Sequence, residues 1–113
     1  MAHVGDAVFE LMIRTWLCTT GTSTARKLHD RSVTFVSAKA QAAAVDRLLP
    51  ELDEEETSVY KRGRNLHMKN IPKGSTNEQY HAATGIESLF GYLYLKGRTE
   101  RLNELFCIVI EEK

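Results

Sequence analysis

The chain has 113 residues, 42% of them hydrophobic, and its 15 Lys and Arg residues balance 15 Asp and Glu residues. This length and apolar content predict a single domain, residues 1–113, with one hydrophobic core, and they exclude a disordered chain. The zero net charge excludes a polyanion partner held by overall charge alone, and the lack of a long apolar run or leader predicts a soluble, intracellular protein.

The first predicted helix covers about residues 4–17, where nine of the fourteen residues are apolar. Asp6, Glu10 and Arg14 follow one another at intervals of four and form a narrow polar strip along it. The apolar side chains cover more than one face of this helix. Phe9, Ile13 and Trp16 extend past the stripe of Val4, Val8 and Leu11, which is more than one small core needs. This pattern predicts a homodimer that uses this helix or the later helix around residue 87.

The remaining predicted helices follow in chain order. They cover about residues 25–30, a longer stretch that starts at Ser32 or Ser37 and ends at Leu49 before Pro50, residues 53–62, residues 78–96 with Gly97 as the stop, and residues 99–112 with Thr99 as the cap. No strand-like alternation of any length occurs. The sequence therefore predicts an all-α fold of about six helices.

Two carboxylates stand alone in apolar surroundings. Asp6 is the only formally charged side chain before Glu10, and Glu87 is the only one between Glu78 and Lys96. A buried carboxylate is costly unless a proton, a cation or a metal neutralises it. One interpretation pairs each acid with an Arg or a backbone donor. The other brings the two together as a site for Mg²⁺ or Mn²⁺, which prefer oxygen ligands.

Other acids have simpler interpretations. Glu10 could be a third ligand, but a salt bridge to Arg14 four residues later is favoured. The acidic run 51–56 could imitate a metal cluster, but Asp53 and Glu56 are spaced as a capping box at a solvated helix start.

The stretch 61–73 carries the local positive charge. It contains no acid, and its candidate RNA-binding residues are Lys61, Arg62, Arg64, Asn65, Lys69 and Lys73. The absence of aromatic residues favours contact with the backbone of a duplex over stacking on single-stranded bases. Lys39 and Gln41, at a helix start, are further RNA-contact candidates. The alternative is a solvated loop that balances the acidic run before it.

These residues resemble the RNase III endonuclease family. Residues 5–8 (GDAV) are similar to the end of its signature motif, and residues 87–95 (ESLFGYLYL) resemble its second acidic motif. Residues 36–42 (VSAKAQA) and 61–65 (KRGRN), with Tyr80 ahead of residues 83–85, resemble the Mini-III branch, a catalytic domain without a double-stranded-RNA-binding domain.

The resemblance implies a helical homodimer that cleaves double-stranded RNA with Mg²⁺ held by Asp6 and Glu87. It also implies maturation of a large-subunit (23S) ribosomal RNA precursor, in a bacterial cytoplasm or a plastid. Two usual carboxylates of the family are replaced here by Ala2 and Thr84. A rival hypothesis is therefore a catalytically inactive, ribosome-associated RNA-binding module, and a third is a nucleotide pyrophosphohydrolase that uses the acidic run.

Overall fold

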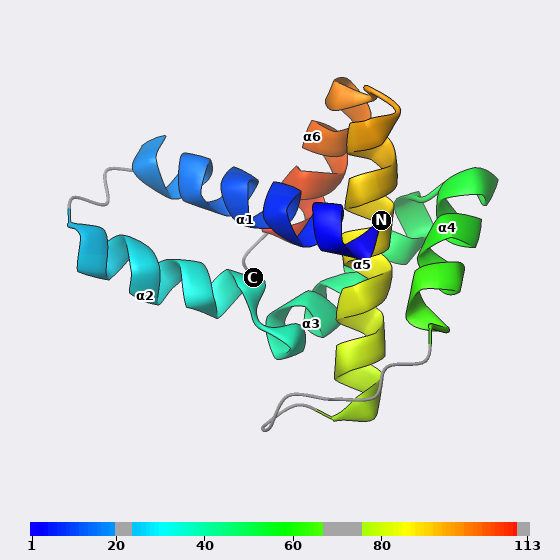
Figure 1. Cartoon of the computed structure of the whole chain (residues 1–113), viewed down its shortest axis with the longest axis horizontal. Coiled ribbons are helices and arrows are strands. Elements are labelled where there is room, and N and C mark those ends of the chain that lie inside the picture. Colours follow the sequence, from blue (N-terminus) through cyan, green and yellow to red (C-terminus); the bar gives the residue numbers. More distant parts are fainter. Residues whose placement is uncertain (20–23, 67–75, 111–113) are drawn as a thin grey trace.

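The computed structural model describes residues 1–19, 24–66 and 76–110, and every regular element within them is a helix. In chain order they are α1 (Ala2–Thr19), α2 (Ala25–Val36), α3 (Ala38–Leu48), the short 3-10 helix η1 (Leu49–Glu51), α4 (Glu54–Arg64), α5 (Asn77–Leu95) and α6 (Thr99–Val109) (Figure 1). The predicted all-α fold of about six helices is confirmed. None of these helices is long and apolar enough to cross a membrane.

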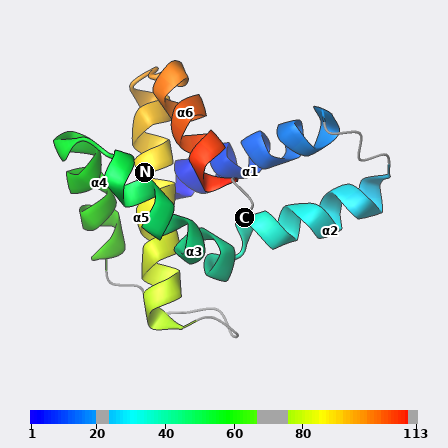
Figure 2. The same cartoon turned by 180° about the vertical axis from the view of Figure 1, so that it is seen from behind.

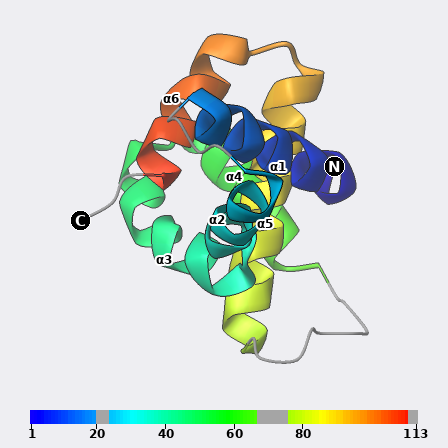
Figure 3. The same cartoon turned by 90° about the vertical axis from the view of Figure 1, so that its left-hand side faces the viewer.

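Helix α5 is the central element, because α1, α3, α4 and α6 all pack against it. In Figure 1, α1 crosses in front of α5 while α4 lies beside it. The view from behind shows α3 and α6 on the opposite side (Figure 2). Helices α1 and α2 pack side by side, and in Figure 3 both point toward the viewer in front of α5.

The core lies between α5 and the helices around it. The Phe9 ring of α1 packs 5.3 Å from the Phe90 ring of α5 and 6.3 Å from the Phe106 ring of α6, measured between centroids. Phe9 is 1% exposed and Ile13 is fully buried. The expectation that these two side chains exceed the needs of one core is therefore wrong, since the core of a single chain uses both.

The break between α2 and α3 falls at Ser37. Its hydroxyl accepts a hydrogen bond from the backbone N–H of Ala40 at 3.2 Å, which makes it the N-cap of α3. Ser32, the other expected cap, lies inside α2 and is buried. The helix expected to end near residue 30 thus runs on to Val36.

The boundary between α5 and α6 lies at Gly97, the predicted stop. Gly97 has φ of +71°, and the backbone N–H of Arg98 donates to the carbonyl of Leu93 at 2.9 Å. This is the left-handed turn that glycine accepts without strain. Thr99, the expected cap of α6, is instead its first residue. Arg98 precedes it without a capping side-chain bond.

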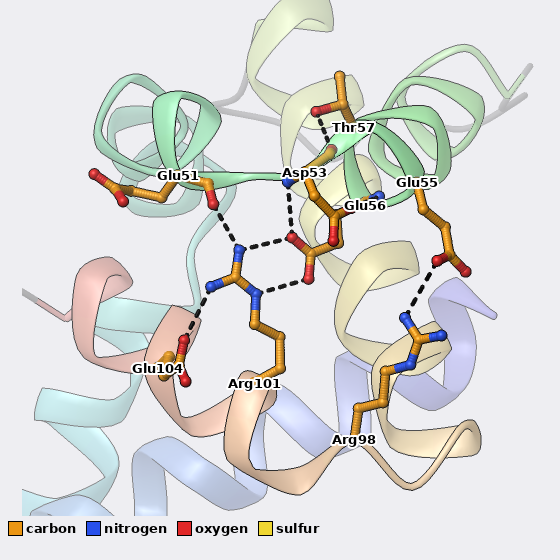
Figure 4. A network of polar contacts seen from close by, with 8 residues as sticks. All are labelled: Glu51, Asp53, Glu55, Glu56, Thr57, Arg98, Arg101 and Glu104. Atoms are coloured by element: carbon orange, nitrogen blue, oxygen red, sulfur yellow. Dashed lines mark hydrogen bonds and ion pairs between the residues drawn. The ribbon is translucent and has the colours of Figure 1, made fainter.

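The acidic run at the start of α4 is not wholly solvated. Asp53 and Glu56 form the predicted capping box. The Glu56 side chain, however, is 1% exposed, and the guanidinium of Arg101 donates to its two oxygens at 2.8 and 2.7 Å (Figure 4). Arg101 also donates to the carbonyl of Glu51 and to Glu104. The hydrogen bonds from Arg101 to Glu56 hold the pKa of Glu56 below its usual value, and the Arg101–Glu56 pair links α6 to α4.

Candidate active site

Two glycines let α1 and α5 cross with their backbones in contact. A Cβ atom added at Gly5 would lie 1.5 Å from the carbonyl oxygen of Glu87, and one added at Gly91 would lie 2.3 Å from the carbonyl oxygen of Met1. No side chain fits at either position unless the helices separate. Because Asp6 directly follows Gly5, the same crossing sets Asp6 beside Glu87.

The carboxyl groups of Asp6 and Glu87 interact, but the expectation that both are buried is wrong for Asp6, which is exposed, whereas Glu87 is half-buried. Burial raises the pKa of Glu87, and hydrogen bonding to Asp6 and the negative charge of Asp6 raise it further, to about 8. Without a cation, Glu87 therefore keeps a proton at neutral pH. Within the described ranges neither carboxylate forms an ion pair with Lys or Arg. Such a pair suits a divalent cation, which would replace the proton and neutralise both charges.

Neighbouring side chains add little to the capacity of Asp6 and Glu87 to bind a metal. Glu10 pairs with Arg14, as predicted. Thr84, one turn before Glu87, is 4% exposed, and its hydroxyl donates to the carbonyl of Tyr80 at 3.0 Å. The described part of the chain has no cluster of three His, Cys, Asp or Glu side chains that could hold a metal. A cation at this site would complete its coordination with water and with oxygens of the substrate.

A groove of about 700 Å³ opens beside Asp6, between α1, the end of α5 and α6. Its walls are largely apolar and include Leu11, which is 65% exposed, and Tyr94, which is 56% exposed. An apolar surface of this kind next to charged catalytic candidates is typical of a surface that another protein covers.

The predicted RNA-binding residues gather at the C-terminal end of α4. Lys61 and Arg62 are exposed there, and Asn65 is the exposed C-cap of the helix. The guanidinium of Arg64 lies over the Tyr60 ring, 5.8 Å from its centroid. The structure thus offers a compact group of cations on one helix end. Lys69 and Lys73, predicted to extend this group, lie outside the described residues.

The two candidates on α3 differ from each other. Lys39 is exposed in the first turn of α3. Gln41 is 2% exposed, and its side-chain nitrogen donates to the carbonyl of Val36 at 3.1 Å. This burial contradicts the expectation that Gln41 contacts RNA, because the amide already closes the junction between α2 and α3.

The sequence does not single out His81 as a functional residue. His81 of α5 lines a pocket together with Arg64 and Asn65. The four histidines are scattered along the sequence, so that only the packing of α4 on α5 reveals this neighbourhood.

Comparisons with known proteins agree with this geometry. A sequence model of the Ribonuclease III domain matches residues 1–98. A protein named Mini-ribonuclease 3 from Thermoanaerobacter sp. (strain X514) is 45% identical over 115 residues, which cover 99% of this chain and 81% of the relative. A Mini-ribonuclease 3 from Clostridium tetani is 40% identical, over 97% of this chain and 74% of the relative. The crystal structure of protein FN1578 from Fusobacterium nucleatum superimposes with a TM-score of 0.87 at 32% identity, covering 96% of this chain and 87% of that one.

Proposed function

The chain belongs to the ribonuclease III family, in its Mini-ribonuclease 3 branch, and is an endoribonuclease; we propose that it cleaves double-stranded RNA with a divalent cation, Mg²⁺ or Mn²⁺. The observation that carries the proposal is the interacting pair of Asp6 and Glu87, held together where α1 and α5 cross. Both carboxylates would hold the cation. The chemistry that such an ion supplies when bound is activation of a water molecule and neutralisation of charge on the phosphate.

The chain's own residues have three tasks in this proposal. Glu87 releases its proton when the cation binds, so that cation affinity rises with pH. The glycine crossing fixes the two carboxylates before RNA arrives. Lys61, Arg62 and Arg64 hold phosphates of the duplex, with Asn65 beside them.

The proposals for further RNA contacts, substrate, compartment and oligomeric state rest on the resemblance to the same family. Lys39 is proposed as a further contact to the RNA backbone, together with Lys69 and Lys73 outside the described residues. The substrate proposed is a large-subunit (23S) ribosomal RNA precursor, in a bacterial cytoplasm or a plastid. The protein is proposed to act as a homodimer, with the apolar groove beside Asp6 as part of the interface.

The deciding experiment measures cleavage of duplex RNA with and without Mg²⁺ by wild type, Asp6→Asn and Glu87→Gln. Each variant should lose several kcal/mol of the stabilisation that the cation gives to charge in the transition state. We therefore expect each to cut at least about a hundredfold more slowly. Glu10→Gln is the matched control, since Glu10 lies in the same groove but pairs with Arg14. Near wild-type cleavage by either Asp6→Asn or Glu87→Gln in saturating Mg²⁺ would contradict the assignment. An inactive RNA-binding module would bind the duplex and leave it uncut at every metal concentration.

A further inference from the structure

A pocket of about 370 Å³ lies between the C-terminal end of α4 and the first turns of α5, at the lower ends of both helices in Figure 1. It is lined by Arg64, Asn65, Leu66, Glu78 and His81. The volume falls within the range of pockets that bind small molecular groups. Its polar side chains supply donors from α4 and α5 and one acceptor.

The donors on the α4 side are held in place. The Nε atom of Arg64 donates to the side-chain oxygen of Asn65 at 3.3 Å, and the guanidinium rests on the Tyr60 ring. The guanidinium also hydrogen-bonds to the Tyr60 side chain. Since a guanidinium carries five N–H donors, its remaining N–H groups and the amide nitrogen of Asn65 can still donate to a ligand. A guanidinium that is fixed in advance loses less entropy when it binds an anion.

The donor on the α5 side is His81. Its Nδ1 atom is buried and has no hydrogen-bond partner among the described residues. A proton on Nδ1 would lack an acceptor, which favours the tautomer with the proton on Nε2. His81 lines the pocket, and because Nδ1 is closed off, Nε2 is the ring nitrogen that can donate to a ligand there.

Glu78 gives the pocket its acceptor. Its side chain is exposed in the first turn of α5, at the rim. A carboxylate would weaken a site for a free phosphate, because both are negative. It suits a ligand that presents a hydroxyl beside its phosphate, and the 2′-hydroxyl of a ribose is such a group.

We propose that this pocket binds one ribose–phosphate unit of the RNA strand. Arg64, Asn65 and His81 donate to its phosphate oxygens. Glu78 accepts the hydrogen of its 2′-hydroxyl, so that the pocket distinguishes RNA from a backbone without this group. His81 lies six residues before Glu87 on α5, or roughly 9 Å along the helix axis, which places the unit away from the scissile phosphate. This inference rests on the proposed function, since it assumes an RNA ligand.

The test measures affinity in EDTA for two duplexes of one sequence, one of RNA and one with 2′-fluoro riboses. Fluorine keeps the A-form shape and removes the hydroxyl donor. We expect wild type to prefer RNA about fivefold, and Glu78→Ala to bind both duplexes equally. His81→Phe, which keeps the ring shape and loses the donor, should weaken binding to both duplexes about fivefold to tenfold. His81→Gln should recover part of that affinity, because its amide nitrogen can replace Nε2.

Glu100→Ala is the matched control, since Glu100 also lies in the first turn of a helix, α6, at the other end of α5. It should leave the preference for RNA unchanged. A Glu78→Ala variant that keeps the wild-type preference, or a folded His81→Phe variant with wild-type affinity, would overturn the proposal. If Mg²⁺-dependent cleavage and its loss in Glu87→Gln hold while these affinities do not change, the pocket assignment alone fails. If wild type neither binds nor cuts duplex RNA, the proposed function fails with it.

Discussion

Asp6 and Glu87 form a site whose charge depends on what occupies it. Two carboxylates in contact repel each other when both are ionised, and burial adds to that cost at Glu87. A proton relieves the repulsion in the absence of metal, and a divalent cation relieves it better. In the proposed metal site, protons and cations therefore compete for the same place, which would tie both cation binding and folding stability to pH.

At the residue scale, the metal-free protein should lose stability as pH rises. The pKa of Glu87 is raised to about 8 in the folded chain, above its value of about 4.5 in the unfolded one. The folded state thus binds the proton more tightly, and this contribution is complete below pH 4.5 and lost as pH passes 8. Its slope is at most about 1.4 kcal/mol per pH unit for one proton. Melting temperatures in EDTA between pH 5 and 8.5 should fall for wild type.

Glu87→Gln should flatten this dependence, because the amide does not titrate. Glu100→Gln, an exposed acid on α6, should keep the wild-type slope. Added Mg²⁺ should raise the wild-type melting temperature most at the alkaline end. Equal slopes for wild type and Glu87→Gln would show that the proton on Glu87 contributes nothing to stability.

The sequence shows that Asp6 and Glu87 are isolated acids in apolar helices, which is enough to select them. It does not show that they meet, because that depends on a backbone crossing between residues more than eighty positions apart. It also misjudges Glu56 and Gln41. Both are polar residues in helices with exposed neighbours, and only the packing of Arg101 and of the α2–α3 junction buries them.

At the element scale, α5 is approached closely from two sides. Gly5 of α1 meets the backbone of α5, whereas Gly63 of α4 meets chiefly a side chain. A Cβ at Gly63 would lie 2.4 Å from the hydroxyl oxygen of Ser88 and farther, at 3.1 Å, from the carbonyl oxygen of Thr84. A backbone obstacle can be relieved only by moving a helix. A side-chain obstacle can be removed by a second substitution.

This difference predicts how two glycine variants behave. Gly5→Ala should destabilise the protein by about 3 kcal/mol or more and should slow cleavage, because Asp6 moves away from Glu87. Gly63→Ala should cost about 1–3 kcal/mol. Adding Ser88→Gly to Gly63→Ala should give a double variant that is destabilised by less than the sum of the two single effects. Urea denaturation of Gly5→Ala, Gly63→Ala, Ser88→Gly and the double variant measures these effects. Additive effects at Gly63 and Ser88 would mean that the close approach of these two residues is not limiting.

The helix boundaries show where local chemistry decides and where it does not. The stop at Gly97 and the cap at Ser37 follow from backbone conformation and a hydroxyl, which the sequence displays. Thr99 has the right chemistry for a cap, yet the turn after Gly97 lets α6 begin one residue earlier, with Arg98 in the capping position. The local sequence does not reveal that the turn at Gly97 moves the capping position of α6 from Thr99 to Arg98.

At the scale of the whole molecule, the apolar surface around α1 is the strongest sign of a partner. Leu11 is 65% exposed, and Leu95 and Tyr94 at the end of α5 are 62% and 56% exposed. A second copy placed on this surface would bring two active sites near each other. The sequence predicts a dimer through Phe9, Ile13 and Trp16 of α1. Phe9 and Ile13 lie in the core and Trp16 packs partly buried against it, whereas Leu11, expected in the inner stripe, is the exposed large hydrophobic side chain of that helix.

The dimer can be tested by light scattering at tens of micromolar. Wild type should have twice the mass of the chain, and Leu11→Lys should shift it toward the monomer, because the charge would be buried in the interface. Leu66→Lys, at a residue that is 50% exposed at the far end of α4, should keep the wild-type mass. A monomer mass for wild type would rule out the dimer, and an unchanged mass for Leu11→Lys would move the interface elsewhere.

The distribution of charge over the whole molecule determines how its affinity for RNA depends on salt. With 15 basic and 15 acidic residues, long-range attraction to RNA is weak, and affinity must come from a few close interactions with phosphates. Removing one cation that binds a phosphate lowers the slope of log affinity against log salt by somewhat less than one. Arg62→Ala with Arg64→Ala should therefore weaken binding to all duplex sequences alike and flatten that slope by between one and two. Arg26→Ala with Lys27→Ala removes the same charge from α2, away from α4, and should change the slope much less. Equal slopes for the two double variants would mean that binding follows net charge, and that the end of α4 does not hold the phosphates.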